Sequence, residues 1–234
     1  MSEQRRIAEI LDKAESVRSK QQKALEAVRQ LERSSFRSMH GNPKANPHGW
    51  PVERLGDVIS FVGGSQPPKE TFISEPSDGY VRLVQIRDFK SDRYPTYIPK
   101  ELAKRHFAKD DVMIARYGPP VFQILRGLEG SYNVALMKAE NTSRTTKEFI
   151  FHLLQIPEIH DFVVAHSDRT AGQSGVNLTL LSNLEIPIPP IKVQRTIGQT
   201  LAQIECVSIR VQRHLGESSD LFNSLVQRAF QGDL

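Results

Sequence analysis

Few residues of this 234-residue chain have types and spacing that suit catalysis. His160 and His166 lie six residues apart with no Cys or paired carboxylates beside them, so they predict surface or core histidines rather than metal ligands. Asn42-Pro43-Lys44-Ala45 begins like the Asn-Pro-Pro-Tyr site of amino-methyltransferases. It lacks the second Pro and the aromatic ring that would hold a flipped base, and we interpret it as a turn.

Motifs for phosphate, metal and nucleophilic chemistry are missing from the sequence. No Gly-x-x-x-x-Gly-Lys-[Ser/Thr] loop and no His-Glu-x-x-His pair occurs, and Gly63-Gly64 lacks the third glycine of a dinucleotide fingerprint. The single cysteine, Cys206, excludes a disulfide framework and a Cys-rich metal site. We therefore expect a non-catalytic chain that binds no metal and no cofactor of its own.

The charge of the chain is unevenly distributed. Its net charge is +4, yet residues 43–190 contain 17 Lys+Arg and 17 Asp+Glu, so the excess lies in the terminal segments. Any affinity of the middle for an anionic partner must come from how its charges are arranged. Charged residues interrupt the N-terminus, and no apolar run approaches the ~20 residues of a membrane span, so we expect a cytoplasmic protein without membrane attachment.

The elements that must position any site include one helix that occurs twice. An offset of 190 residues superposes Ile7 on Ile197, Leu11 on Leu201 and Leu25 on Leu215, and both copies end in Gly followed by Asn or Asp. A repeat of this length predicts two equivalent helical rods that flank one globular unit. At about 1.5 Å per residue, some 35 residues make a rod of roughly 50 Å.

Both copies carry apolar residues at alternating spacings of three and four, as in a coiled coil. The N-terminal stripe runs through Ile7, Ile10, Ala14, Val17, Gln21, Ala24, Val28 and Leu31, and Leu11, Leu25 and Phe36 widen it. The C-terminal stripe runs through Ile197, Leu201, Ile204, Ser208, Val211, Leu215, Ser218, Phe222, Leu225 and Ala229. We expect the two rods to pack together along these residues; the alternative is two amphipathic helices that lie on the globular unit.

The middle of the chain predicts a mixed domain. Residues 80–86, 111–118 and 132–139 read as strands, whereas residues 147–154 and 157–166 read as helices. The expected fold is an α/β (α+β) domain over residues 43–190, between long helices over residues 1–42 and 191–234.

Three stretches resemble the specificity (S) subunits of type I restriction–modification systems. They are residues 171–178 (AGQSGVNL), residues 184–191 (LEIPIPPI) and the helix from Gln194 to Leu234; residues 46–58 also look like the domain opening of that family. The family pattern alternates two target-recognition domains with two long helices. This chain has the order helix, domain, helix, and so looks like half a subunit.

The resemblance implies separate roles for the domain and the helices. The domain would read one half of a split target in double-stranded DNA, and the helices would fix the distance between half-sites. The helices would also dock DNA methyltransferase subunits, which carry the catalytic site and S-adenosylmethionine, and a restriction (translocase) subunit could join. A symmetric homodimer would restore two recognition domains.

The side chains that would read bases are a further expectation. Direct readout uses Arg or Lys for guanine, Asn or Gln for adenine, and Ser or Thr for either. Loop and strand-end residues of these types, with one neighbouring tyrosine, are Ser65, Gln66, Lys69, Gln85, Arg87, Lys90, Arg93, Arg116, Tyr117, Gln123, Asn133, Arg144, Gln173, Ser174 and Asn177.

The strongest group is Gln85 to Asp88, because a strand end places Gln and Arg beside a carboxylate that orients the guanidinium. Arg116 and Tyr117 follow, with an Arg that caps the sheet as the alternative. Residues 172–175 form either a phosphate-approaching loop or a hinge between domain and rod.

Two other readings of the whole chain stay open. In one, the rods are the function, as in a coiled-coil adaptor or a competitor that sequesters methyltransferase subunits without reading DNA. The zero net charge of residues 43–190 favours it. In the other, the chain is the recognition half of a larger nuclease–methyltransferase assembly. The complete domain between the rods favours DNA recognition.

Overall fold

The computed structural model describes residues 2–118, 120–170 and 173–232. The chain divides into two compact units: residues 1–39 together with 197–234, and residues 40–196. We call the first unit the helix pair and the second the central domain, and each is described by itself.

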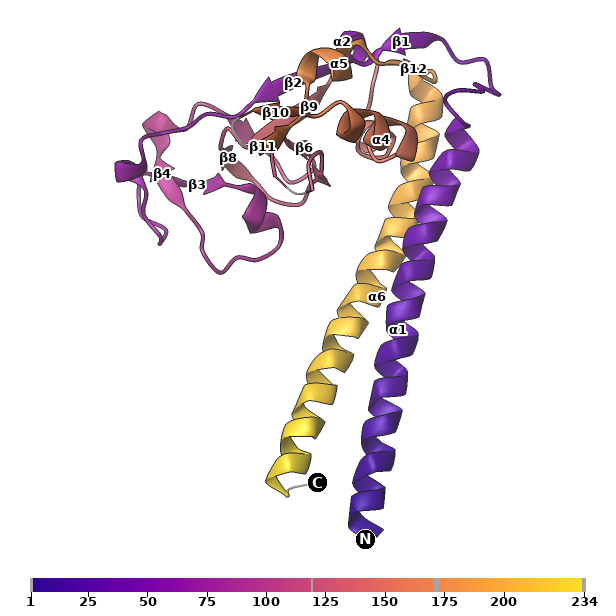
Figure 1. Ribbon diagram of the computed structural model, residues 1–234, viewed down its shortest axis with the longest axis vertical. Coiled ribbons are helices and arrows are strands. Elements are labelled where there is room, and N and C mark those ends of the chain that lie inside the picture. The colour runs from indigo at the N-terminus through magenta and orange to yellow at the C-terminus, as the bar shows by residue number, and fades with distance from the viewer. Residues whose placement is uncertain (1, 119, 171–172, 233–234) are drawn as a thin grey trace. The chain divides into compact units, whose positions relative to one another are not determined.

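The helix pair consists of α1 (Ser2–His40) and the greater part of α6 (Ile191–Gln231), which lie side by side (Figure 1). Gln21 accepts a hydrogen bond from the Ser218 hydroxyl, and the Arg18 guanidinium lies 4.6 Å from the ring centroid of Phe222. A residue earlier in α1 thus meets a residue later in α6, so the helices are antiparallel. The two long helices pack together, as the sequence predicts.

The seam of α6 follows the three–four stripe read from the sequence. Its buried and half-buried positions include Ile197, Leu201, Ile204, Ser208, Val211, Leu215, Ser218, Phe222, Leu225 and Ala229. The corresponding positions of α1 are Ile7, Leu11, Ala14, Arg18, Gln21, Leu25, Val28, Glu32, Ser35 and Met39. Ile10 is half-buried beside this line.

The seam of α1 differs from its predicted stripe at Val17, Ala24 and Leu31, which are exposed. Val17 and Leu31 are 48% and 53% exposed, and for these three residues the prediction is wrong. Ile10-Leu11 and Ala24-Leu25 offer an apolar residue at two adjacent positions, so apolarity alone allows two registers. The register that forms buries Leu25 to 3% exposure and brings Arg18 into the seam, where its guanidinium stacks on Phe222.

The internal repeat specifies this register. The 190-residue offset carries every seam position of α6 onto a seam position of α1. Because the helices are antiparallel copies of one sequence pattern, an approximate two-fold axis perpendicular to the plane of the pair relates them. The contacts Gln21–Ser218 and Arg18–Phe222 place Leu25 opposite Leu215, its own repeat equivalent, next to this axis.

The central domain contains two four-stranded sheets. The first has the order β2 (Ile59–Gly63), β9 (Leu136–Asn141), β6 (Val112–Ala115), β7 (Ile124–Leu125) and is antiparallel. The second has the order β4 (Tyr97–Pro99), β3 (Tyr80–Val84), β8 (Gly130–Tyr132), β5 (His106–Phe107), and β3 runs parallel to β8.

Smaller elements complete the central domain. Two-stranded ribbons pair β1 (Val52–Arg54) with β12 (Glu185–Pro187), and β10 (Asp168–Thr170) with β11 (Gln173–Gly175). The helices are α2 (Leu55–Val58), α3 (Lys147–Leu153), α4 (Pro157–Ala165) and α5 (Leu178–Asn183), with 3-10 turns η1 (Lys69–Thr71), η2 (Ile86–Phe89) and η3 (Lys100–Leu102).

The predicted elements form, with shifted bounds. The strand expected from residue 132 splits: β8 ends at Tyr132 and β9 begins at Leu136. Between them the Asn133 side chain accepts a hydrogen bond from the Ala135 N–H at 3.2 Å, which closes a turn that hydrophobic alternation does not reveal. Thr146 caps α3 by accepting from the Phe149 N–H at 3.2 Å, and Pro157 opens α4.

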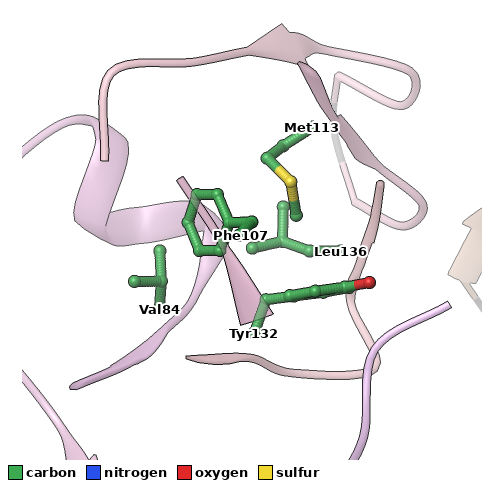
Figure 2. Packing of buried hydrophobic residues seen from close by; sticks show 5 residues of the cluster. All are labelled: Val84, Phe107, Met113, Tyr132 and Leu136. Carbon is green, nitrogen blue, oxygen red and sulfur yellow. The ribbon is translucent and has the colours of Figure 1, made fainter. Parts of the chain in front are cut away.

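The two sheets share one core cluster (Figure 2). Val84, Phe107 and Tyr132 come from the second sheet, whereas Met113 and Leu136 come from the first, and all five are 5% exposed or less. The Tyr132 hydroxyl also donates to the Val62 carbonyl of β2 at 3.2 Å, and burial raises the pKa of Tyr132 to about 12. The sheets therefore hold a fixed arrangement at the strand ends that lie near Tyr132.

A buried glutamine holds the first turn of α6 within the central domain. The Gln194 side chain is fully buried; it accepts from the Thr146 N–H at 2.9 Å and donates to the carbonyls of Arg144 at 2.8 Å and Pro189 at 2.9 Å. Its repeat equivalent, Gln4, is exposed. No helix in the described ranges is long and apolar enough to cross a membrane.

Candidate nucleic-acid interface

Two amide side chains follow neighbouring strands of the second sheet. Because β3 and β8 are parallel and pair Val84 with Tyr132, their carboxyl ends lie side by side at the same end of the sheet. Gln85 and Asn133 come next along the chain, and the Asn133 N–H donates to the Val84 carbonyl at 3.2 Å. The structure thus brings together two predicted residues that are 48 positions apart in sequence. We call Gln85, Asn133, Ser65, Arg116 and Tyr117 the strand-end cluster.

Ser65 joins the cluster because the chain after β2 passes closely over Asn133. The Ser65 N–H donates to the Tyr132 carbonyl at 3.2 Å, and a Cβ on Gly64 would lie 2.0 Å from the Asn133 carbonyl oxygen. Only glycine fits there, so backbone packing accounts for Gly64. The Ser65 hydroxyl is buried and has no hydrogen-bond partner among the described residues.

Arg116 and Tyr117 follow β6 and contribute the cation of the cluster. The Arg116 N–H donates to the Ala135 carbonyl at 2.9 Å, and its guanidinium lies 5.2 Å from the ring centroid of Tyr117. The Tyr117 backbone bridges Gly175 of β11. Both side chains are half-buried, so Arg116 packs on the sheet and stays partly accessible. This position is compatible both with an Arg that caps the sheet and with an Arg that contacts a phosphate or base.

A hydrogen-bond network fixes the residues that follow Gln85. The Gln85 amide and the Arg87 guanidinium both donate to the Thr96 hydroxyl, at 3.1 and 3.2 Å. Asp88 is buried, accepts from the Gln85 N–H at 2.8 Å and lies 3.8 Å from Arg87 Nε. Burial raises the pKa of Asp88. The Asp88 carboxylate lies near the Arg87 guanidinium, but the hydrogen bond that holds the guanidinium goes to Thr96.

Tyr94 is a candidate that the sequence pattern did not reveal. It is 62% exposed in the loop between η2 and β4, and the Arg93 guanidinium lies 5.2 Å from its ring centroid. Arg87 donates to the Tyr94 carbonyl at 3.5 Å, and Arg82 pairs with Asp92. A braced loop that exposes an aromatic ring beside cations suits stacking on a base or sugar. The signal available in the sequence was an aromatic residue inside a polar loop.

The remaining predicted residues have other partners in the central domain or are exposed. Arg144 pairs with Glu53 of β1, the Gln123 amide donates to the Pro120 carbonyl at 2.9 Å, and Asn177 caps α5. Gln66, Lys69, Lys90 and Arg93 are exposed. The side chains of Gln173 and Ser174 lie outside the described residues.

The described residues contain no group of three or more His, Cys, Asp or Glu side chains that could hold a metal ion. What the strand-end cluster and the adjoining loop present is amide groups, guanidinium groups and tyrosine rings. These groups suit hydrogen bonding and stacking, and they contain no paired nucleophile and base.

The sequence of this chain matches the model of a known protein family. Residues 47–215 match the type I restriction modification DNA specificity domain. The chain belongs to this family. The match confirms the resemblance read from the sequence.

Curated relatives are similar over most of this chain. It is 24% identical over 175 residues to the MjaVIII specificity subunit of Methanocaldococcus jannaschii, a match that covers 73% of this chain and 39% of that protein. It is 23% identical over 188 residues to the EcoKI specificity subunit of Escherichia coli strain K12, covering 74% and 40%. The matches therefore span about two fifths of the length of these relatives.

Solved structures share the fold. The HsdS subunit of Thermoanaerobacter tengcongensis superposes with a TM-score of 0.61 at 23% identity, over 100% of this chain and 59% of that one. The S subunit of M. genitalium superposes with a TM-score of 0.64 at 14% identity, over 97% and 60%. A mixed domain with two long packed helices is thus a known architecture.

Proposed function

We propose that this chain is the sequence-recognition component of a type I restriction–modification complex and has no catalytic site of its own. The observation that carries the proposal is the match of residues 47–215 to the DNA specificity domain family. The strand-end cluster supports it, because amide and guanidinium groups at one edge are the groups that read adenine and guanine.

In this proposal the central domain reads one half-site of double-stranded DNA. Gln85 and Asn133 contact base edges, and Arg87, Arg93 and Arg116 contact phosphates or guanine. Residues 43–190 carry no net charge, so we expect the isolated chain to bind DNA weakly and the methyltransferase subunits to strengthen binding. S-adenosylmethionine belongs to that partner, and a restriction subunit can join the complex.

The helices have two roles in this proposal: they set the distance between half-sites and dock the methyltransferase. A split target needs a second recognition domain, which a symmetric homodimer supplies. The seam between α1 and α6 is filled within one chain, so the contacts of such a dimer lie on other surfaces. The recognised motif is then palindromic, with an unread spacer.

Methylome sequencing tests the function. The chain is co-expressed with the methyltransferase of its system in a host that lacks both, and modified bases are mapped. We expect one two-part motif that appears only when the chain is present. Methylation that does not depend on the chain would overturn the specificity function. It would favour the alternative that the helices sequester methyltransferase subunits, which the zero net charge of residues 43–190 also favours.

A further inference from the structure

One buried hydroxyl group holds two of the side chains that follow β3. The Thr96 hydroxyl accepts hydrogen bonds from Gln85 Nε2 at 3.1 Å and from Arg87 Nη2 at 3.2 Å. Thr96 itself is 7% exposed, and its carbonyl accepts from the Leu83 N–H of β3 at 2.8 Å. The hydroxyl is therefore fixed to the sheet, next to the strand end that presents Gln85.

The two donors do not need this hydroxyl to satisfy their hydrogen-bonding capacity. Gln85 is half-buried and the Arg87 side chain is 57% exposed, so water can reach both groups. A donor that water can satisfy loses little free energy when its protein partner is removed. Because threonine is β-branched, its hydroxyl has few rotamers. What the Thr96 hydroxyl adds is therefore direction, since it holds an amide and a guanidinium in one orientation.

The orientation of the Gln85 amide matters for recognition of a base. An amide has a donor group and an acceptor group of nearly the same shape, and a rotation of 180° exchanges them. A glutamine that distinguishes adenine from other bases must present the two groups in a fixed order. The bond from Gln85 Nε2 to Thr96 sets that order. Asn133 is fixed independently, because its side chain accepts from the Ala135 N–H at 3.2 Å.

The same hydroxyl limits the donors that Arg87 can offer to DNA. Arg87 Nη2 donates to Thr96 and, at 3.5 Å, to the Tyr94 carbonyl, whereas Nε lies 3.8 Å from Asp88 Oδ1. In the described part of the chain, no residue accepts from Nη1. With Nη2 engaged, Arg87 offers one nitrogen rather than the pair that reads guanine O6 and N7. One nitrogen suits a phosphate oxygen.

We propose that Thr96 is a positioning residue for base recognition, an inference that rests on the proposed function. Its hydroxyl holds the Gln85 amide in the orientation that distinguishes one base pair from the others, and it holds Arg87 as a phosphate contact. Without the hydroxyl, the Gln85 amide rotates and its donor and acceptor exchange places. The domain then still binds DNA but no longer reads the base pair opposite Gln85.

The test uses the full chain in complex with the methyltransferase subunit of its system, and the motif found by methylome sequencing. Duplexes differ from the cognate site by one base pair, at each read position in turn. Titrations give the affinity of the complex for each duplex and for scrambled DNA. The position opposite Gln85 is the one at which Gln85→Ala removes discrimination. There we expect the wild-type complex to bind the changed duplex at least about tenfold more weakly than the cognate duplex.

Thr96→Val replaces the hydroxyl by a methyl group of similar size. At the position opposite Gln85 it should reduce discrimination to within about threefold, because the rotating amide accepts several bases. Affinity for scrambled DNA should stay within about twofold of wild type, since phosphate contacts carry it. Adding Thr96→Val to Gln85→Ala should cause no further loss of discrimination there, because Thr96 acts through Gln85.

Two further variants separate positioning from an effect on the fold. Thr96→Ser keeps the hydroxyl and should restore discrimination. Thr71→Val makes the same substitution at a half-buried threonine whose hydroxyl donates to the Pro68 carbonyl at 2.7 Å, and it should behave as wild type.

Three results would contradict the inference. If Gln85→Ala or Thr96→Val keeps wild-type discrimination at every position, the inference fails while the proposed function stands. Equal weakening on cognate and scrambled DNA, without rescue by Thr96→Ser, would show that Thr96 supports the fold and would also overturn it. If the wild-type complex discriminates at no position, the proposed function fails and the inference fails with it.

Discussion

Gln85 and Asn133 present two amide side chains from neighbouring strand ends, and an amide can both donate to and accept from adenine. We predict that Gln85→Ala or Asn133→Ala weakens binding to the cognate site by about 1–3 kcal/mol. Binding to unrelated DNA should change little, because phosphate contacts carry it. Titration of the methyltransferase complex with cognate and scrambled duplexes measures both.

Gln212→Ala is the matched control for the amide variants. It removes the same group from an exposed position of α6 and should leave both affinities unchanged. Equal loss on cognate and scrambled DNA would show that Gln85 and Asn133 support the fold or the backbone contact instead of reading bases.

Tyr94 makes a different prediction, because its exposed ring offers stacking rather than hydrogen bonding. Tyr94→Ala should weaken DNA binding by roughly 1–3 kcal/mol, whereas Tyr94→Phe should keep most of the affinity. The loop is braced from Arg82 and Arg87, so neither change should unfold the domain. Electrophoretic mobility shifts with equal melting temperatures provide the check. Equal loss in both variants would assign the effect to the hydroxyl.

We predict that the buried His152 side chain makes the stability of the central domain depend on pH. Burial, and secondarily the charge of Arg126, lowers its pKa from 6.5 to about 4. The unfolded chain therefore takes up a proton that the folded domain does not, so stability is full above pH 6.5 and is lost as pH falls towards 4. The loss attributable to His152 is at most about 3 kcal/mol.

Urea unfolding at pH 7 and pH 4.5 measures this loss, and His152→Gln should reduce the difference between the two pH values. His40 is also buried with a lowered pKa and acts in the same direction, so part of the acid sensitivity remains in the variant. An unchanged pH dependence would mean that the His152 ring accepts its proton without unfolding.

Individual residues were predictable from the sequence only where local chemistry decides their role. Gln85 was identified from a strand end, and the structure places Asp88 near Arg87, although Thr96 makes the hydrogen bond that holds the guanidinium. The proximity of Asn133 to Gln85 depends on a parallel pairing of β3 with β8, which no local pattern records. Tyr94 was missed because exposure of an aromatic ring is a property of the folded loop.

At the scale of elements, the register of the helix pair makes a sharp prediction. Leu25 is 3% exposed and Leu31 is 53% exposed, although both belong to the apolar stripe of α1. Leu25→Asp places a charge in the seam and should lower the free energy of unfolding of the helix pair by at least about 3 kcal/mol. Leu31→Asp should change it by no more than about 0.5 kcal/mol. Thermal unfolding followed by helical circular dichroism compares them.

The helix pair shows which features of the fold the sequence could specify and which it could not. Both long helices, the seam of α6 and the strands β3, β6, β8 and β9 follow from periodicity and capping. In α1, adjacent apolar residues allow two registers, and the register that forms stacks Arg18 on Phe222 across the pair although it places Arg18 and Glu32 in the seam. The internal repeat contained the answer, because the correct register is the one that superposes the two copies.

At the scale of the whole molecule, one recognition domain per chain raises the question of the second half-site. The repeat makes the two ends of the helix pair nearly equivalent, yet only one end continues into the central domain within this chain. In the proposed function, a second copy of this chain supplies the second recognition domain with two-fold symmetry.

We predict that the purified chain has twice its single-chain mass of 26.5 kDa in light scattering. The complex should bind a duplex with two half-sites far more tightly than one with a single half-site, since the second contact is intramolecular. A chain that stays monomeric at high concentration, with an asymmetric methylated motif, would show that a different chain provides the second domain.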